Sequence, residues 1–184
     1  VEYLMNDEEM EQSFRLKLND AGADISELKA GIRFSTSDIG ASKVYASVFY
    51  DADGVRTTCN SGIALEHKGE ASPQLYTESC KQLGMVFKES EELIEKLGNM
   101  NISDVAGVLQ EIRENYSIFP KGISEKVEAE LRIQYPGGGT AIDVYLALND
   151  IIQRYSEENK ISPTRYLNLS EQVAKLMHLP FERI

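Results

Sequence analysis

The spacing of apolar residues changes once along this chain, near Ser72, and this change restricts the folds that the chain can adopt. Between residues 34 and 65, apolar and polar residues alternate in short runs separated by polar turns, which is typical of half-buried β-strands. After Ser72, apolar residues recur every three to four positions, as on one face of a helix. The sequence therefore predicts an α+β fold, with a small antiparallel sheet in the N-terminal half (residues 1–70) covered by about four to five helices in residues 72–184.

Short alternating segments define the predicted strands. The tetrapeptide Asp-Ala-Asp-Gly at 51–54 favours a tight hairpin turn, because Asp and Gly accept the positive φ angles that such a turn needs. The β-branched and aromatic residues of Lys43–Tyr50 favour the central position in the sheet. The predicted strands are Ser13–Leu18, Ala30–Ser35, Lys43–Tyr50, Val55–Cys59 and, as a short strand or loop, Ile63–His67.

Each predicted helix begins at a Ser or Thr that could cap its first turn. Ser72, followed by Pro73 at the first helical position, opens a segment that continues to Gly98 as one helix or as two helices with a kink. The remaining helices are predicted to begin at Ser103, Ser124, Thr140 and Ser162. Before the segment that begins at Thr140, residues 136–139 (Pro-Gly-Gly-Gly) cannot continue a helix and are predicted to form a linker.

The size and composition of the chain fit a single domain, residues 1–184. Hydrophobic residues make up 42% of the 184 residues, which is enough for a packed core. The chain begins at Val1, as a trimmed fragment would, and its acidic start does not fit a secretory signal. No apolar run approaches the roughly 18 residues of a membrane-spanning helix. The two cysteines form no CxxC pair and fit no disulfide framework, so we expect a reduced, cytoplasmic protein.

An excess of acidic residues gives the chain a formal net charge of −11. This charge opposes sequence-independent binding to the backbone of DNA or RNA, which needs clustered Lys and Arg. The acidic residues are densest in Asp7–Glu11 and Glu89–Glu95. One interpretation is that the charge only keeps the protein soluble, and the other is that an acidic face meets a partner with a basic surface.

The sequence offers no complete catalytic, metal or cofactor motif. The glycines before Thr140 lack the lysine of a Walker loop and follow a predicted helix, whereas a dinucleotide-binding loop follows a strand. Ser37, Asp38 and His67 have the residue types of a hydrolytic triad, but the GxSxG elbow is missing, and turn formation accounts for the Ser and the Asp. Cys59 has no paired histidine and is typical of a buried cysteine at a strand end. We therefore predict a binding protein rather than an enzyme, with no catalytic residue, cofactor or metal.

Asn149 is the residue at which helix propensity and hydrophobic pattern disagree. It lies in the middle of a predicted helix among apolar neighbours, although Asn is a poor helix former. A buried Asn amide needs hydrogen-bond partners. Asp143, in the first turn of the same helix, interacts favourably with the helix dipole. We predict that this helix packs across the sheet and that Asn149 faces the loop at 37–40 or the loop at 60–62.

Three short motifs at these positions give the chain a resemblance to a known family. Ser35–Gly40 reads STSDIG, Cys59–Gly62 reads CNSG with His-Lys-Gly at 67–69, and Gly139–Ile151 reads GTAIDVYLALNDI. They are similar to the motifs SNSE[VI]G and CxNG[ML], and to a Gly- and Thr-rich turn that opens a helix. These motifs belong to a phage/plasmid-like family of unknown function, the domain of unknown function numbered nine hundred and thirty-two. The asparagine of the second motif is displaced by one position, and Tyr145 stands where Trp is common in the family.

The resemblance implies a protein of phages or other mobile elements that works in the bacterial cytoplasm, and it implies no activity. Together with Asp143, the matched positions give six binding candidates: Ser37, Asp38, Asn60, Thr140, Asp143 and Asn149. We expect an acidic accessory protein that binds a host or phage protein with a basic surface, for instance as an inhibitor of a CRISPR-type defence nuclease. The alternative is a nucleic-acid-handling protein for single-strand binding or recombination support. Its basic face would consist of Arg15, Lys17, Arg33, Lys43 and Arg56.

Overall fold

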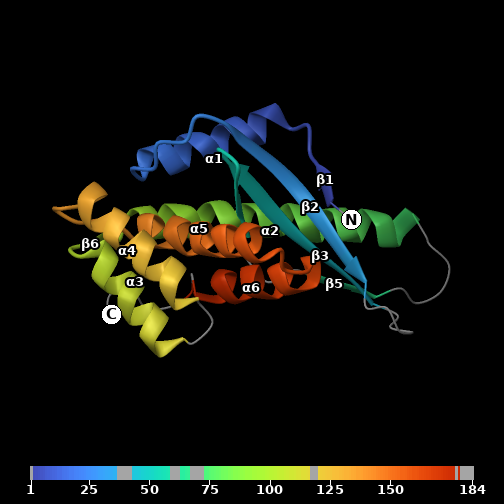
Figure 1. Ribbon diagram of the computed structural model, residues 1–184. Coiled ribbons are helices and arrows are strands. Elements are labelled where there is room, and N and C mark those ends of the chain that lie inside the picture. Colours follow the sequence, from blue (N-terminus) through green and yellow to red (C-terminus); the bar gives the residue numbers. More distant parts are fainter. Residues whose placement is uncertain are drawn as a thin grey trace.

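The structure is a computed structural model that describes residues 2–36, 43–58, 63–66, 73–116, 120–176 and 178. A small antiparallel sheet in the N-terminal half is covered by helices, which confirms the predicted α+β fold (Figure 1). The strands of the sheet are β1 (Glu2–Leu4), β2 (Leu28–Thr36), β3 (Lys43–Ala52), β4 (Val55–Thr57) and β5 (Ile63–Glu66). The helices are α1 (Glu8–Asp20), α2 (Pro73–Gly98), α3 (Val105–Asn115), α4 (Lys121–Gln134), α5 (Ala141–Asn159) and α6 (Pro163–Leu176).

Strand β3 is central in the sheet, as the sequence predicts. It pairs with β2 from Leu28 opposite Ala52 to Thr36 opposite Val44. Its other edge pairs with β4 at one end and with β5 at the other. The hairpin between β3 and β4 turns at Asp53 and Gly54, whose φ angles of 49° and 86° confirm the predicted tight turn.

Residues 13–18 belong to helix α1, so the prediction of a first strand there is wrong. The side chains alternate over this short window, but Phe14 and Leu18 lie four positions apart and both are buried. The Asp7 carboxylate caps the helix by accepting a hydrogen bond from the Met10 amide at 3.0 Å. A buried helical face and a capped first turn outweigh local alternation, so the N-terminal region contains a helix as well as strands.

Helix α2 is continuous from Pro73 to Gly98, which decides between the two alternatives that the sequence left open. Helix α5 begins directly after Thr140, and helix α6 begins at Pro163, as predicted. No helix in the described part of the chain is long and apolar enough to cross a membrane.

Two helices begin at positions other than the predicted ones. Asp104, not Ser103, caps α3, because its Oδ1 accepts a hydrogen bond from the Gly107 amide at 2.8 Å. Helix α4 begins after Pro120 rather than at Ser124, and the Ser124 hydroxyl instead donates to the Pro120 carbonyl at 3.1 Å. In both cases, the serine lies close to the helix start, but another residue occupies the cap position.

The segment predicted as a linker, residues 136–139, runs into a short ladder. Strand β7 (Gly139–Thr140) pairs antiparallel with β6 (Asn101–Ile102), and the sequence did not predict either strand. Gly138 has a φ of 92°, and a Cβ atom there would lie 2.4 Å from the Ile102 carbonyl oxygen. Only glycine fits this close approach of two backbones. The ladder fixes the point at which α5 begins.

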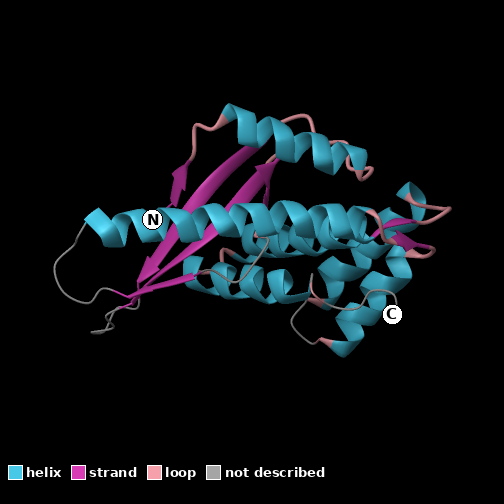
Figure 2. Ribbon diagram, turned by 180° about the vertical axis from the view of Figure 1, so that it is seen from behind, coloured by secondary structure: helices cyan, strands magenta, loops and turns pink. Residues whose placement is uncertain are grey.

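One face of the sheet forms the core with α1 and α2. The ring of Phe14 from α1 stacks on Tyr50 from β3 with 3.7 Å between centroids. Tyr50 also meets Phe87 of α2 edge-on at 6.0 Å. Figure 2 shows α2 lying across this face. Because side chains alternate along a strand, the neighbours of Tyr50 in β3 project from the opposite face.

The edge of β2 that faces away from β3 is covered by β1 and by a carboxylate of α1. Strand β1 pairs with Gly31–Arg33, and the Met5 amide donates to the Ala30 carbonyl at 2.8 Å. Glu11, only 6% exposed, accepts a hydrogen bond from the Ala30 amide at 3.0 Å and pairs with Lys29 at 3.3 Å. Glu11 therefore satisfies a backbone donor that no strand reaches.

Replacing this carboxylate tests its role at the sheet edge. We expect Glu11→Ala to lower the free energy of unfolding by about 1–3 kcal/mol, because the buried Ala30 amide would lose its acceptor. The control Glu111→Ala removes an exposed carboxylate of α3 and is expected to change stability by about 0.5 kcal/mol or less. Urea denaturation followed by circular dichroism measures both values, and equal effects would contradict the role of Glu11.

Candidate functional site

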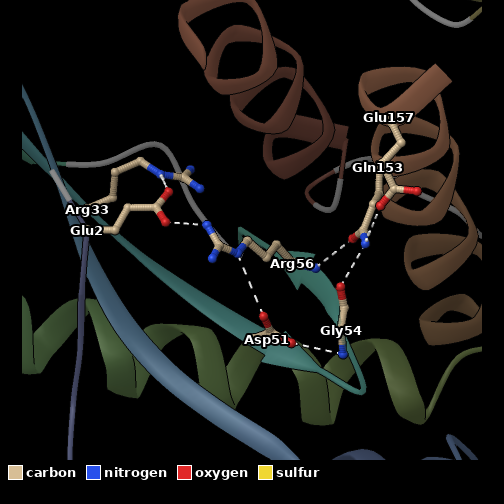
Figure 3. A network of polar contacts seen from close by, with 7 residues as sticks. All are labelled: Glu2, Arg33, Asp51, Gly54, Arg56, Gln153 and Glu157. Atoms are coloured by element: carbon tan, nitrogen blue, oxygen red, sulfur yellow. Dashed lines mark hydrogen bonds and ion pairs between the residues drawn. The ribbon is translucent and has the colours of Figure 1, made fainter. Parts of the chain in front are cut away.

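A groove with a volume of about 780 Å³ lies between the sheet and the helices α5 and α6. The polar and aromatic side chains that line it come from three strands and two helices: Glu2, Arg33, Arg56, Gln153, Glu157 and Tyr166. Arg33 and Arg56 occupy the strand positions that alternate with the core-facing ones, opposite Ser47 and Asp51 of β3. The groove is therefore on the face of the sheet that does not pack on α2, as Figure 3 also shows.

Glu2 joins the two arginines of the groove (Figure 3). Arg33 Nε donates a hydrogen bond to Glu2 Oε1 at 2.8 Å. Arg56 Nη1 donates to the other carboxylate oxygen, Glu2 Oε2. Glu2 of β1 lies directly opposite Arg33 of β2 in the antiparallel ladder. Strand pairing therefore brings together a carboxylate and a guanidinium that are 31 positions apart in the chain.

Both guanidinium groups lie over one aromatic ring. The central carbons of Arg33 and Arg56 are each 5.3 Å from the centroid of Phe49. The face of an aromatic ring attracts a cation, but two cations over one ring repel each other unless an anion lies between them. Glu2 supplies this anion. Gly31 leaves room for the ring, since a Cβ atom there would lie 2.4 Å from Phe49 Cζ.

Arg33 is a buried cation, and one of its donor atoms has no partner within the described ranges. Only 4% of Arg33 is exposed, and its guanidinium carbon also lies 5.8 Å from the ring centroid of Tyr166 on α6. Arg33 Nη2 has no hydrogen-bond partner among the described residues. A buried donor without a partner costs free energy, and an acceptor oxygen that reached Nη2 would remove that cost. The charged residues that line the groove are Arg33 and Arg56 together with the carboxylates of Glu2 and Glu157.

Arg56 is held in place by α5 and by the hairpin. Its backbone amide donates to Gln153 Oε1 at 3.2 Å, and Gln153 Nε2 donates to the Gly54 carbonyl at 2.8 Å. The Nε atom of Arg56 lies 3.7 Å from Asp51 Oδ2. Gln153 therefore ties the hairpin to α5, while the Arg56 side chain remains 40% exposed and accessible to a ligand.

Glu2 ionises more readily than an ordinary glutamate. Burial opposes its charge, but the hydrogen bonds and charges of Arg33 and Arg56 outweigh burial, so the pKa of Glu2 lies below its ordinary value of 4.5. Burial raises the pKa of the Tyr166 hydroxyl, although the nearby Arg33 charge acts in the opposite direction. At neutral pH, an ionised Glu2 carboxylate therefore lies between the two guanidinium groups, and the Tyr166 phenol beside them is neutral.

Thr140 and Asp143, two of the predicted binding residues, lie at the start of α5. Asp143 Oδ2 accepts a hydrogen bond from the Thr140 amide at 2.7 Å, which ties down the first turn. Asp143 is buried beside Tyr135. The pKa of the Tyr135 hydroxyl is raised first by the burial of this hydroxyl and second by the Asp143 carboxylate. These residues are at the β7 end of α5, whereas Gln153 and Glu157 of the groove lie toward its other end.

Asn149 is buried, as predicted, with 2% of its surface exposed. Its Nδ2 atom donates to the Tyr145 carbonyl one helical turn earlier, at 2.9 Å. The Tyr145 hydroxyl donates to the Thr58 carbonyl at 2.6 Å, so α5 packs against the sheet where β4 ends, as predicted. Ser37, Asp38 and Asn60 lie outside the described residues, as do both loops that Asn149 was predicted to face.

Of the five cations in the predicted nucleic-acid face, the described contacts bring together Arg33 and Arg56. Arg15 and Lys17 lie on α1, where Arg15 donates to a backbone carbonyl at 2.7 Å and Lys17 pairs with a glutamate of α2 at 3.2 Å. The Lys43 side chain lies outside the described part of the structure. Arg33 and Arg56 share the Glu2 carboxylate, so their positive charge is partly neutralised within the fold.

The four residues weighed for catalytic chemistry all lie outside the described ranges. These are Ser37, Asp38, Cys59 and His67. Cys80, which is described, is an exposed free cysteine on α2. Within the part of the chain that the structure describes, no group of three or more His, Cys, Asp or Glu residues could hold a metal ion.

Comparisons with known proteins gave no match: no protein-family model, no curated protein and no solved structure matches the chain. The resemblance to the phage/plasmid-like family therefore stays a prediction that rests on its three short motifs. Most of the first motif and all of CNSG fall outside the described residues, and the third motif covers the start and middle of α5.

Sequence reasoning missed Glu2 and the pairing of Arg33 with it. Arg33 was identified as a cation of the sheet, but the sequence did not show that it is buried. The available signal was its alternation with Ala30 and Ile32 in a strand, which places Arg33 on a face opposite to the apolar one. No pattern marked β1, since three residues are too few for one.

The contribution of Glu2 to stability is expected to depend on pH. Because its pKa is lower in the folded than in the unfolded chain, ionised Glu2 stabilises the fold above the unfolded value, and this contribution disappears as the pH falls through the folded pKa. We expect the stability difference between the wild type and Glu2→Gln to be constant from about pH 7 to about pH 5.5 and to shrink below about pH 4.5. Urea denaturation at a series of pH values measures this difference, with Glu111→Gln as the control. A difference that is independent of pH would contradict the pairing.

Asn149→Leu is expected to lower the free energy of unfolding by about 1–3 kcal/mol, because Leu cannot donate to the Tyr145 carbonyl and must fit a packed interior. Asn168→Leu, at an exposed position of α6, serves as the control with a change of about 0.5 kcal/mol or less. Thermal and urea denaturation measure both variants. Unchanged stability together with loss of partner binding would assign Asn149 to a binding site instead.

Proposed function

We propose that this protein is a binding protein that holds an acidic group of a partner protein in the groove between the sheet and helices α5 and α6. Arg33 carries the proposal, because this buried guanidinium lies beside the groove and next to the accessible Arg56, and its Nη2 atom has no partner among the described residues. A carboxylate has two oxygens that match the paired donors of a guanidinium, and Asp and Glu side chains present such a group on protein surfaces.

The exposed surface of α1 and α2 supports a partner that is basic around this acidic group. The two densest acidic runs of the sequence lie on these helices, which pack against each other. The exposed carboxylates of these two helices include those of Glu8, Glu9, Glu89, Glu92 and Glu95. Opposite charges on two surfaces steer their encounter and raise the association rate. A basic surface that carries one protruding acidic side chain would therefore match both features of this protein.

The biological setting that we propose follows from the motif resemblance. In this setting, the chain is an accessory protein of a phage or another mobile element, and its partner is a host protein. A CRISPR-type defence nuclease is one partner of the required kind, because its nucleic-acid channel is lined with basic residues. The net charge of −11 and the three motifs support this setting.

The alternative, a nucleic-acid-handling role, has less support. Arg33 and Arg56 share a carboxylate, and Lys17 is paired with one. Binding to a phosphate backbone would require these cations to leave their partners, against the repulsion of the remaining acidic surface. A gel shift with single-stranded oligonucleotides at low salt separates the two roles. Tight binding with a steep salt dependence would favour the alternative.

Capture of the partner and a single substitution test the proposed function. The tagged chain is used to recover binding proteins from host lysates, and the affinity of each recovered protein is then measured for the wild type and Arg56→Gln. We expect Arg56→Gln to weaken binding about tenfold or more, because it removes a charge-assisted hydrogen bond. The matched control is Arg132→Gln, which removes an exposed arginine of α4. If the wild type, Arg56→Gln and Arg132→Gln all bind the captured protein with equal affinity, the proposed role of the groove is refuted.

A further inference from the structure

We infer that β1 is a built-in occupant of this binding site, and that the partner binds with an extended segment that replaces β1 along β2 and places a Glu or Asp between Arg33 and Arg56. This inference rests on the proposed function and adds the conformation and the chemistry of the segment that is bound. Such strand addition uses main-chain hydrogen bonds for affinity and side chains at alternate positions for specificity.

Strand β1 is held by few interactions. It has three residues, and it pairs with Gly31–Arg33 only. Tyr3 and Leu4 are 59% and 63% exposed, so their burial contributes little to holding the strand. The ring of Tyr3 does meet Phe34 edge-on at 6.1 Å. Segments with little buried apolar surface open at a lower free energy than the core does.

The backbone around β1 defines the place of an incoming strand. On one side, the Ala30 amide already donates to Glu11, so the free edge of β2 begins at Gly31. Glu2 of β1 lies opposite Arg33 of β2, and its two carboxylate oxygens bind Arg33 Nε and Arg56 Nη1. A strand in the same register would present an acidic side chain to the same donors. The register thus selects one position in the partner segment for Glu or Asp.

The unused donor of Arg33 gives an incoming carboxylate an advantage over Glu2. Glu2 engages Arg33 through Nε and leaves Nη2 without a partner among the described residues. A carboxylate that binds Nε and Nη2 together makes the two parallel hydrogen bonds of a guanidinium fork. One additional charge-assisted hydrogen bond strengthens binding by about tenfold or more. This gain is available to a segment whose backbone is not constrained by the connection to α1.

The partner segment competes with β1 for the edge of β2, and β1 has the advantage of being part of the same chain. This advantage sets the affinity that the partner segment needs. A segment tethered by a short linker has an effective concentration in the millimolar range. Strand β1 is followed by α1 after three residues, so it rebinds readily after opening. A partner segment must therefore gain its affinity from the fork on Arg33 and from contacts outside the groove, such as those with the acidic helices α1 and α2.

A labelled peptide that copies residues 1–6 of this chain tests the inference by fluorescence anisotropy. We expect the full-length Glu2→Gln variant to bind this peptide at least about tenfold more tightly than the wild type, because the internal carboxylate no longer competes. A peptide with Gln in place of its Glu is expected to lose this gain. The double variant Glu2→Gln/Arg56→Gln is also expected to lose it, whereas Glu2→Gln/Arg132→Gln should retain it. Equal binding of both peptides, or no gain in Glu2→Gln, would overturn the inference.

Two further measurements complete the test. The first needs no variant, and the second asks whether β1 of a second copy, rather than a partner segment, binds along β2. In the wild-type chain, we expect the Met5 amide, which bonds the Ala30 carbonyl, to exchange with solvent at least about tenfold faster than the amides of β3. Equal rates would mean that β1 opens only when the whole protein unfolds, and would overturn the inference without any variant. If size-exclusion chromatography shows a wild-type dimer that Glu2→Gln dissociates, the occupant is β1 of a second copy, and the partner segment is wrong.

The outcomes of this experiment and of the partner capture are distinguishable. If Arg56→Gln weakens binding of the captured protein while the peptide measurements fail, the groove binds an acidic group but β1 is not replaced. If the peptide measurements succeed while Arg56→Gln does not affect the captured protein, strand replacement is correct and the proposed role of the groove in partner binding is wrong.

Discussion

The outer edge of β2 is the constraint on which both the fold and the groove depend. An edge strand presents unpaired backbone groups that would pair with another chain if they were left uncovered. Here the edge is closed by β1 opposite Gly31–Arg33 and by the Glu11 carboxylate at Ala30. Strand β1 places Glu2 beside Arg33 on one face of the sheet, and the bond of Glu11 to Ala30 holds α1 against the other face. A single edge therefore links the core beneath the sheet to the groove above it.

Pairing of cations within the fold leaves the acidic excess at the surface. Arg113 donates to Glu128 at 2.7 Å, and Arg154 binds Glu130 and Asp150 at 2.8 Å each. The groove follows the same principle, because Arg33 and Arg56 share one carboxylate. Paired arginines contribute orientation more than stability, since desolvation offsets much of the attraction between the charges. What distinguishes the groove from these other pairs is that Arg33 Nη2, a buried guanidinium donor, has no partner in the part of the chain that the structure describes.

The sequence predicted the elements that are marked by a long hydrophobic pattern or a distinct turn motif. It failed where the pattern spans few residues or where the contact joins residues far apart in the chain. The change of period near Ser72 and the turn at Asp53-Gly54 were sufficient for the helices and for the central hairpin. In Ser13–Leu18, six residues alternate as in a strand, and only the longer spacing of Phe14 and Leu18, with the cap at Asp7, reveals α1. The site depends on register: Glu2 and Arg33 meet because of strand pairing, and no local pattern specifies which residues face each other across a ladder.

The acidic exterior and the two arginines of the groove together restrict the proposed ligand more than either does alone. A free anion would have to approach a molecule whose net charge is −11, and this repulsion extends over about one Debye length, roughly 8 Å at physiological ionic strength. The same field attracts a basic protein surface, and an acidic side chain carried on that surface reaches the groove without the repulsion that a free anion meets. In the proposed strand replacement, it would take the place of Glu2, the anion that lies between the two guanidinium groups over Phe49. The charge distribution therefore favours a carboxylate presented by a basic protein over a small anion of the same chemistry.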